Sequence, residues 1–478
     1  MASAHDVEHY DFISLGSGAA GKFVAATLAR SGKRTAILER KYYGGSCPNI
    51  ACLPSKNIIY SAKVQHLVAH GEGFGLPKDV RDRAKGAVNM PAVINRKREM
   101  VRGMQRFHEQ MFDAAHAEYI WGEGKFVAPR TLEIEWDDKK RLVKADMIMV
   151  CTGSSPAIPS IEGLKEANPL THIEILELEE VPTHLIVLGG GYVGLELAQA
   201  MKRFGAEVTV IERGDRVLKL EDNDIADFLR SVLEAEGVVF KTSVSITSVS
   251  GRSGASDGVV LKGTASGEKF ELRGSHILCA TGRVPNTADI RLDQAGIEVT
   301  QQGHIKVDES NRTTAEGVFA GGDCAGSPYF THIGVDDFRI VRDFLSGANS
   351  DTKDFRRSGR QVPSTLFTDP EFAMVGLRER DAQAQGIKYR LAKLPMEVSL
   401  RTRTIGEPHG FSKALISTED DTILGFAAVG AHAGELLPVV QLAMKRKLPY
   451  TDVADLIITH PTFNEGLVML FMGVPPRA

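Results

Sequence analysis

A strand, a glycine-rich turn, a helix and a second strand follow one another at two places in this sequence. In the first copy an apolar strand pattern covers residues 11–15 and the second strand closes at Glu39; in the second copy these features are residues 184–188 and Glu212. The distance from the first glycine to the acidic residue is 23 positions in both copies, 16 to 39 and 189 to 212. The chain therefore carries one βαβ unit twice. The glycines of the two turns are Gly16, Gly18 and Gly21, and Gly189, Gly191 and Gly194.

This spacing predicts two dinucleotide-binding sites. The first glycine allows the tight turn, the second lets the backbone approach a pyrophosphate, and the third lets the helix pack close to the strand. The helix N-terminus then faces the phosphate charge. Glu39 and Glu212 are suited to accept hydrogen bonds from the ribose hydroxyls. Glu212 also favours NAD over NADP, because it would repel a 2′-phosphate, although Arg213 and Arg216 offer positive charge nearby.

Each unit is followed by an apolar strand that ends in Thr-Gly. The first strand ends at Thr152 and Gly153, and the second ends at Thr281 and Gly282. We interpret them as the later strands of two sheets. Thr152, Gly153 and Gly282 are therefore expected beside the cofactors.

The length and composition indicate a multidomain enzyme acting on small molecules. A chain of 478 residues exceeds a single core, and 43% hydrophobic with 25% charged residues is typical of a globular protein. A net charge of −4 gives no reason to expect nucleic acid or an anionic membrane as partner. The sequence has no apolar run of membrane-spanning length and no leader pattern, so a cytoplasmic location is expected.

Cys47 and Cys52 lie five positions apart just after the first unit. One helical turn would bring their thiols within bonding distance. A structural metal site, two unrelated buried thiols and a redox disulfide are the three interpretations. Zinc sites usually use tighter spacing and a second ligand pair, so no metal site is predicted. The cation of Lys56 would lower a thiolate pKa, with Glu196 as its expected ionic partner, which favours the redox disulfide.

At this point the sequence resembles a known family. Residues 44–56 are similar to the active-site signature of the class I pyridine nucleotide-disulfide oxidoreductases, which include dihydrolipoamide dehydrogenase, glutathione reductase and mercuric reductase. The resemblance covers nearly the whole chain, including residues 281–286, 318–323 and 368–371. Pro48 and Ala51 depart from the usual motif within the disulfide loop.

The resemblance implies FAD and a nicotinamide as cofactors and a disulfide or dithiol as substrate. A hydride would pass from the nicotinamide to FAD, and electrons would leave through the Cys47–Cys52 disulfide. Cys52 would be the thiol beside the flavin, and Cys47 the thiol that meets substrate. Lys56 and Glu196 would lie near the flavin ring. Asp323 would bind the ribityl chain.

His460 and Glu465 form the second part of the expected active site. A histidine beside a proline is more often structural, but the spacing resembles the family motif His-Pro-x-x-x-Glu. In that motif the histidine is the general acid and base and the glutamate orients it. An imidazole with a pKa near neutrality can protonate a leaving thiolate and deprotonate a dithiol. In relatives this pair comes from the opposite subunit, so a homodimer with a shared active site is expected.

The fold class expected is α/β, with two Rossmann-like dinucleotide-binding domains and a C-terminal α+β dimerisation domain. Residues 423–429 are predicted to form a strand, 434–446 a helix, and 250–258 a hairpin or surface loop. The expected domains are residues 1–180 with 285–360 for FAD, 181–284 for NAD(P), and 361–478 for dimerisation.

The leading function is that of a dihydrolipoamide dehydrogenase-like oxidoreductase, and two alternatives stand beside it. Metal-ion reduction, as in mercuric reductase, is less favoured, because the sequence has no cysteine pair near either end. A flavin-binding assembly or regulatory protein without turnover is the other alternative. Cys151, Cys279 and Cys324 stand in apolar or glycine-rich contexts and are interpreted as structural.

Overall fold

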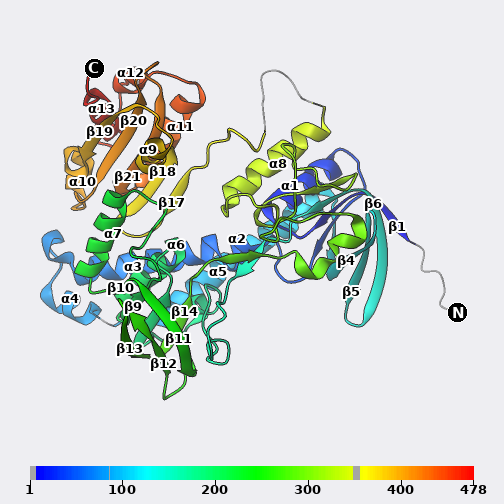
Figure 1. Cartoon of the computed structure of the whole chain (residues 1–478), viewed down its shortest axis with the longest axis horizontal. Coiled ribbons are helices and arrows are strands. Elements are labelled where there is room, and N and C mark those ends of the chain that lie inside the picture. Colours follow the sequence, from blue (N-terminus) through cyan, green and yellow to red (C-terminus); the bar gives the residue numbers. More distant parts are fainter. Residues whose placement is uncertain (1–6, 86, 348–355, 478) are drawn as a thin grey trace. The chain divides into compact units, whose positions relative to one another are not determined.

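The computed structural model describes residues 7–85, 87–347 and 356–477 (Figure 1). It divides into two compact units, each built from three stretches of the chain. Unit one comprises residues 1–57, 92–157 and 282–360, and unit two comprises residues 58–91, 158–281 and 361–478.

Unit one is built on a sheet with strand order β3-β2-β1-β6-β5-β4, in which β16 also pairs with β6. The central strand β1 runs parallel to both β2 and β6. Helices α1 and α8 lie side by side on this sheet (Figure 1). The elements are β1 (Glu8–Leu15), α1 (Ala19–Arg30), β2 (Thr35–Glu39), β3 (Glu118–Trp121), β4 (Glu123–Ala128), β5 (Thr131–Trp136), β6 (Lys139–Val150), β7 (Ser154–Pro156), β15 (Arg283–Pro285), β16 (Val318–Ala320) and α8 (Thr331–Leu345).

The sequence of β1 explains its central place. Tyr10, Phe12, Ile13 and Leu15 are all buried, so both faces of the strand are covered, as is usual for a strand inside a parallel sheet. The predicted first βαβ unit is confirmed by β1, α1 and β2. Three further helices follow along the chain: α2 (Ser46–Asn49) lies within unit one, and α3 (Cys52–Ala69) and α5 (Met90–Ala115) each continue across a division between the units.

The second βαβ unit lies in the middle stretch of unit two, residues 158–281. Its parallel sheet has the order β10-β9-β8-β14. The predicted hairpin at residues 250–258 is confirmed, because β11 and β12 are antiparallel with Gly251 opposite Val259. The elements are β8 (His184–Leu188), α6 (Tyr192–Phe204), β9 (Glu207–Ile211), α7 (Asn223–Ala235), β10 (Val239–Lys241), β11 (Val244–Gly251), β12 (Val259–Ala265), β13 (Glu268–Gly274) and β14 (His276–Cys279), with α4 (Lys78–Ala84) in the same unit.

The C-terminal part of unit two is an antiparallel sheet of order β17-β18-β21-β20-β19. Phe426 and Ala428 on β21 pack with Leu436, Leu470 and Phe471 in one core. The predicted strand and helix are confirmed by β21 and α11. The elements are β17 (Ser364–Leu366), β18 (Glu371–Gly376), α9 (Glu379–Ala384), β19 (Tyr389–Pro395), α10 (Leu400–Thr404), β20 (Phe411–Ser417), β21 (Ile423–Gly430), α11 (Leu437–Lys445), α12 (Tyr450–Ala454) and α13 (Glu465–Met472).

Candidate active site

The two glycine turns have the same backbone geometry. Gly16 and Gly189 both have φ of +102°, a conformation that residues with a Cβ rarely adopt. A Cβ at Gly16 would lie 2.4 Å from the carbonyl oxygen of Cys151, and one at Gly189 would lie 2.5 Å from that of Ala280. Each first glycine thus allows the chain to turn against the end of a neighbouring strand.

The remaining glycines of the turns serve close packing and access. A Cβ at Gly21 would lie 2.0 Å from Ser14 Oγ, and one at Gly194 would lie 2.1 Å from the carbonyl oxygen of Gly189. A Cβ at Gly191 would meet no heavy atom within 4 Å. The N-terminus of α6 is therefore open on the side where a phosphate would approach.

Glu39 and Glu212 hold the turns by the same bond in both copies. Glu39 Oε2 accepts a hydrogen bond from the backbone N–H of Ser17 at 3.0 Å, and Glu212 Oε2 accepts one from that of Gly190 at 2.8 Å. In each case the donor stands between the first two glycines of the turn, 22 positions before the acid. Sequence reasoning had assigned these carboxylates to ribose alone, although the repeated spacing was a signal for this second role.

The strands that precede the two Thr-Gly segments belong to the two predicted sheets, because β6 pairs with β1 and ends at Val150, and β14 pairs with β8. Strand β14 stops at Cys279, and Gly282 begins the segment that returns to unit one. There β15 pairs antiparallel with β7, which follows Gly153. The Thr152 hydroxyl donates to the Asn286 carbonyl oxygen at 2.7 Å. The predicted later strands of the two sheets are therefore confirmed, and Thr152, Gly153 and Gly282 all lie in unit one just beyond them.

Asp323 is the acidic residue beside the paired strands β7 and β15. Its carboxylate accepts a hydrogen bond from the Ser154 hydroxyl, which itself accepts one from Arg283 Nε at 2.7 Å. Burial raises the pKa of Asp323 above its usual value, although Ser154 and Arg283 oppose that rise. Sequence reasoning missed Ser154 and Arg283, yet each directly follows one of the two Thr-Gly pairs.

The space beside Asp323 is suited to a ligand. A Cβ built at Gly153, Gly282 or Gly322 would meet no heavy atom within 4 Å, and all three glycines have positive φ. Their backbones therefore border open space next to the half-buried carboxylate of Asp323 and the guanidinium of Arg283. These residues fit the ribityl hydroxyls and pyrophosphate of a flavin dinucleotide.

Cys47 and Cys52 lie on two helices rather than on one helical turn. Cys47 is on α2, which ends at Asn49, and Cys52 is the first residue of α3. The helix breaks at Ile50, where φ is −137°. The expectation of a single helical turn was therefore wrong, but the two thiols still lie within hydrogen-bonding reach of each other.

The surroundings of the two thiols make them unequal. The pKa of Cys52 is lowered, chiefly by a hydrogen bond from Cys47 and against the effect of burial, with further help from the Thr331 hydroxyl and the charge of Lys56. The same bond, together with burial, raises the pKa of Cys47. Cys52 therefore loses its proton first. This order is expected of a thiol held as thiolate beside a flavin.

Thr331 is a site residue that sequence reasoning missed. It is the first residue of α8, and its Oγ1 lies 3.2 Å from Cys52 Sγ. A thiolate at Cys52 would accept this hydroxyl's hydrogen and face the positive end of the helix. No sequence signal links two residues that are 279 positions apart.

His460 and Glu465 form the expected pair in unit two. His460 Nδ1 donates to Glu465 Oε1 at 2.9 Å, and the N–H of Thr462 donates to Oε2 at 3.0 Å. The bond from His460 lowers the pKa of Glu465. Because Nδ1 is engaged and the side chain is 63% exposed, Nε2 is available for proton transfer. The cysteines belong to unit one, so their encounter with His460 stays a prediction.

The pair of Lys56 and Glu196 also divides between the units. Lys56 lies on α3 in unit one. Glu196 is buried on α6, and its Oε1 accepts a hydrogen bond from the backbone N–H of Phe367 at 2.9 Å. Their ion pair stays a prediction.

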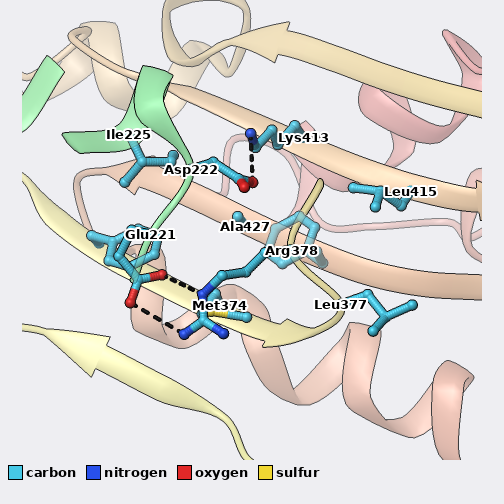
Figure 2. A pocket seen from close by; sticks show the side chains of 11 residues that line it. Glu221, Asp222, Ile225, Met374, Leu377, Arg378, Lys413, Leu415 and Ala427 are labelled. Carbon is cyan, nitrogen blue, oxygen red and sulfur yellow. Dashed lines mark hydrogen bonds and ion pairs between the residues drawn. The ribbon is translucent and has the colours of Figure 1, made fainter. Parts of the chain in front are cut away.

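A small cavity in unit two is lined by ion pairs and apolar side chains (Figure 2). Lys413 Nζ lies 2.9 Å from Asp222 Oδ2, and Arg378 Nε donates to Glu221 Oε2 at 2.8 Å. All four groups are paired and none was a predicted site residue. We therefore interpret the cavity as a structural junction between the second βαβ unit and the C-terminal sheet. Within the described residues, no group of three or more His, Cys, Asp or Glu could hold a metal ion, and no helix is long and apolar enough to cross a membrane.

Two glycine turns and a cysteine pair in one chain define a class: oxidoreductases that bind two dinucleotides and use a redox-active disulfide. A model of the pyridine nucleotide-disulphide oxidoreductases matches residues 10–337, and a model of the dimerisation domain of these enzymes matches residues 362–471. The chain therefore belongs to the pyridine nucleotide-disulphide oxidoreductase family. It is an enzyme and a flavoprotein disulfide reductase, with the fold class predicted, and its family binds FAD and NAD(P)H.

Several proteins are similar to this chain over most of their length. The chain is 31% identical to the probable pyridine nucleotide-disulfide oxidoreductase RclA of Escherichia coli K12, covering 97% of this chain and 98% of RclA. It is 33% identical to dihydrolipoyl dehydrogenase of Thermus scotoductus, with 96% of each chain covered. It is 30% identical to mercuric reductase of Lysinibacillus sphaericus, covering 96% of this chain and 82% of that enzyme. A solved Cu(II) complex of the HOCl-induced flavoprotein disulfide reductase RclA from Escherichia coli superposes with a TM-score of 0.87 at 29% identity, covering 98% of this chain and 99% of that one.

Proposed function

We propose that this enzyme uses NAD(P)H and FAD to reduce a small disulfide, or runs in reverse on a dithiol, through Cys47 and Cys52. The observation that carries the proposal is the placement of Cys52 in the same unit as Cys47, with its Sγ 3.2 Å from the hydroxyl of Thr331 at the N-terminus of α8. The lowered pKa of Cys52 agrees with this placement. FAD, when bound, relays two electrons between the nicotinamide and the cysteine pair. A cytoplasmic location accords with this activity, because a reducing compartment keeps the dithiol available.

The cofactor sites follow from the two glycine turns. The first turn, with Glu39 and the region of Asp323, would hold FAD. The second turn would hold the nicotinamide dinucleotide, and Glu212 supports NAD over NADP because its charge repels a 2′-phosphate. The domain boundaries proposed are residues 1–180 with 285–360, residues 181–284 and residues 361–478.

The substrate step is a pair of thiol–disulfide exchanges. His460 takes the proton of Cys47, the resulting thiolate attacks one sulfur of the substrate disulfide, that bond breaks, and the departing thiolate takes the same proton back from His460. The Cys52 thiolate then attacks Cys47 Sγ, which releases the second substrate thiolate and forms the Cys47–Cys52 disulfide. Glu465 would hold the imidazole in the orientation for this transfer. We propose that the pair comes from the second subunit of a homodimer, for which the dimerisation domain provides the interface.

An anaerobic titration with NADH and with NADPH tests the proposal. The wild-type enzyme should develop a long-wavelength absorption band from the Cys52 thiolate beside oxidised flavin. Cys47→Ser should show this band before any reductant is added, because Cys52 is then a free thiolate, whereas Cys52→Ser should never show it. A band that survives Cys52→Ser would refute the assignment of the thiols. The nucleotide that reduces the enzyme faster identifies the donor.

Reduction of a metal ion is the second candidate function. The mercuric reductases of Lysinibacillus sphaericus and Bacillus cereus are both 30% identical to this chain, and an RclA structure of similar fold is a Cu(II) complex. Two thiolates are also soft ligands suited to such ions. Rates of NADH oxidation with Hg(II), Cu(II), lipoamide and a small disulfide such as cystine decide between the functions. Metal turnover that is abolished by Cys47→Ser, without turnover of either disulfide, would favour this candidate.

A further inference from the structure

Lys22 is a buried cation beside the cysteine turn, the segment from Gly44 to Cys52 that carries both thiols. It follows the third glycine of the first turn and lies on α1 with 5% of its surface exposed. Burying an ammonium group is costly unless it is paired or hydrogen-bonded. Its Nζ donates to the carbonyl oxygen of Gly44 at 2.8 Å and lies 2.7 Å from His108 Nε2. The amine therefore links the cysteine turn to helix α5.

The tautomer of His108 shows which partner donates. His108 Nδ1 lies 2.8 Å from the carbonyl oxygen of Met104, which can only accept, so Nδ1 carries the ring hydrogen. Nε2 of the neutral ring is then an acceptor, and Lys22 donates to it. Burial and the charge of Lys22 lower the pKa of His108 and keep the ring neutral. Burial lowers the pKa of Lys22 to about 8, so the amine is mainly protonated at neutral pH.

Helix α5 holds the cysteine turn at a second point. Asn49, between the two cysteines, donates from Nδ2 to the carbonyl oxygens of Tyr43 and Gly45, both at 2.7 Å. Gln105 Nε2 donates to Asn49 Oδ1 at 2.8 Å. Gln105 and His108 are three positions apart, and hence on one face of α5. The turn is thus fixed by two neighbouring side chains of one helix.

Gly44 allows the approach that Lys22 requires. Its φ is +84°, and a Cβ there would lie 2.8 Å from the imidazole of His108. Among the described residues, the titratable groups that act on Lys22 are Cys47 and His108. The neutral ring of His108 carries no charge, and Cys47 carries a negative charge only as the thiolate. The cation of Lys22 favours the Cys47 thiolate, against the effects of burial and of the bond to Cys52.

We propose that Lys22, held by His108, is a positioning residue that fixes the cysteine turn at Gly44 and stabilises the thiolate of Cys47 when it attacks substrate. The inference rests on the proposed function, in which Cys47 is the thiol that meets substrate. Reduction of the disulfide adds two electrons and breaks the S–S bond, leaving two sulfurs that need either protons or compensating positive charge. Lys22 supplies the charge, and the negative charge that forms on Cys47 raises the pKa of the amine in turn, which keeps its proton in place.

The test is the pH dependence of Cys47 alkylation in the two-electron-reduced holoenzyme. Iodoacetamide reacts with the thiolate and releases iodide, and peptide mass spectrometry separates Cys47 from Cys52. Lys22→Met keeps the apolar stem and removes the charge, so the midpoint for Cys47 should rise by about one pH unit, which is about tenfold slower alkylation at a fixed pH below the midpoint. The absorption band from Cys52 should keep its maximal intensity. Lys41→Met, which removes an exposed lysine near the same turn, should change neither readout.

The outcomes separate charge from packing. An unchanged midpoint for Cys47 alkylation in Lys22→Met would overturn the proposal. Loss of the Cys52 band together with alkylation that is slowed equally at every pH would also overturn it, because a displaced cysteine turn gives that result. If Lys22→Met does not fold, His108→Leu and His108→Gln replace it. The His108→Leu variant cannot accept a hydrogen bond from Lys22, so its midpoint for Cys47 alkylation should rise. The His108→Gln variant can accept that bond and should show the wild-type midpoint; equal midpoints in the two variants would overturn the proposal. Disulfide reduction that persists in Cys47→Ser would instead refute the proposed function, and alkylation alone cannot produce that result.

Discussion

The hydroxyl of Thr331 should set the acidity of Cys52, and Thr331→Val tests this directly. Valine keeps the branched shape of threonine and replaces the hydroxyl with a methyl group. The hydroxyl lies 3.2 Å from Cys52 Sγ, and a hydrogen bond to a charged acceptor contributes about 1.5–3 kcal/mol. Since one pKa unit corresponds to about 1.4 kcal/mol, the pKa of Cys52 should rise by about one to two units in the variant.

The assay is a pH titration of the long-wavelength band in the anaerobically reduced enzyme. The band requires the Cys52 thiolate, so in Thr331→Val it should disappear at a pH where the wild-type enzyme still shows it. Thr331→Ser retains the hydroxyl and should titrate within about half a unit of the wild type, because the same bond is available. Equal midpoints for the valine variant and the wild type would refute the reasoning.

Four further predictions concern the ion pairs of Lys413, the nucleotide preference set by Glu212 and the proton transfer by His460. Lys413→Met should lower the free energy of unfolding of the holoenzyme by about 3–5 kcal/mol in urea, because it leaves the buried carboxylate of Asp222 without its cation, whereas Lys393→Met, at a 44% exposed amine, should cost less than about 1 kcal/mol. The difference in the free energy of unfolding between Lys413→Met and the wild type should become smaller as the pH falls below about 4. The lysines lower the pKa of Asp224 in the folded protein despite its burial. The stability that Asp224 contributes is therefore present above its pKa in the unfolded chain and is lost as the pH falls through its pKa in the folded protein. Glu212→Gln should raise the ratio of kcat/KM for NADPH to that for NADH by about tenfold, and an unchanged ratio would contradict its proposed role. His460→Gln should slow disulfide reduction by about 10²–10⁴-fold while reduction of the flavin by NADH, measured by stopped flow, stays near the wild-type rate.

Features that depend on local backbone conformation could be predicted from the amino-acid sequence alone. The glycine turns could be predicted because Gly16 and Gly189 need a positive φ and a close approach to a strand end, which only glycine satisfies at that spacing. The bond between His460 and Glu465 joins residues five positions apart, so the motif contained it. The two βαβ units could also be predicted from the spacing of their apolar residues, because that spacing is set within each strand and helix.

The tertiary structure decided what depends on contacts between distant segments. Thr331 reaches Cys52 from 279 positions away, and His108 reaches Lys22 from 86 positions away. Neither residue type signals such a partner, because a threonine or a histidine on a helix satisfies its hydrogen bonds in many ways. The break between α2 and α3, which separates Cys47 from Cys52, likewise lies in a turn that other segments hold in place. Acidity and charge at the thiols therefore emerge only when the fold brings these groups together and removes them from water.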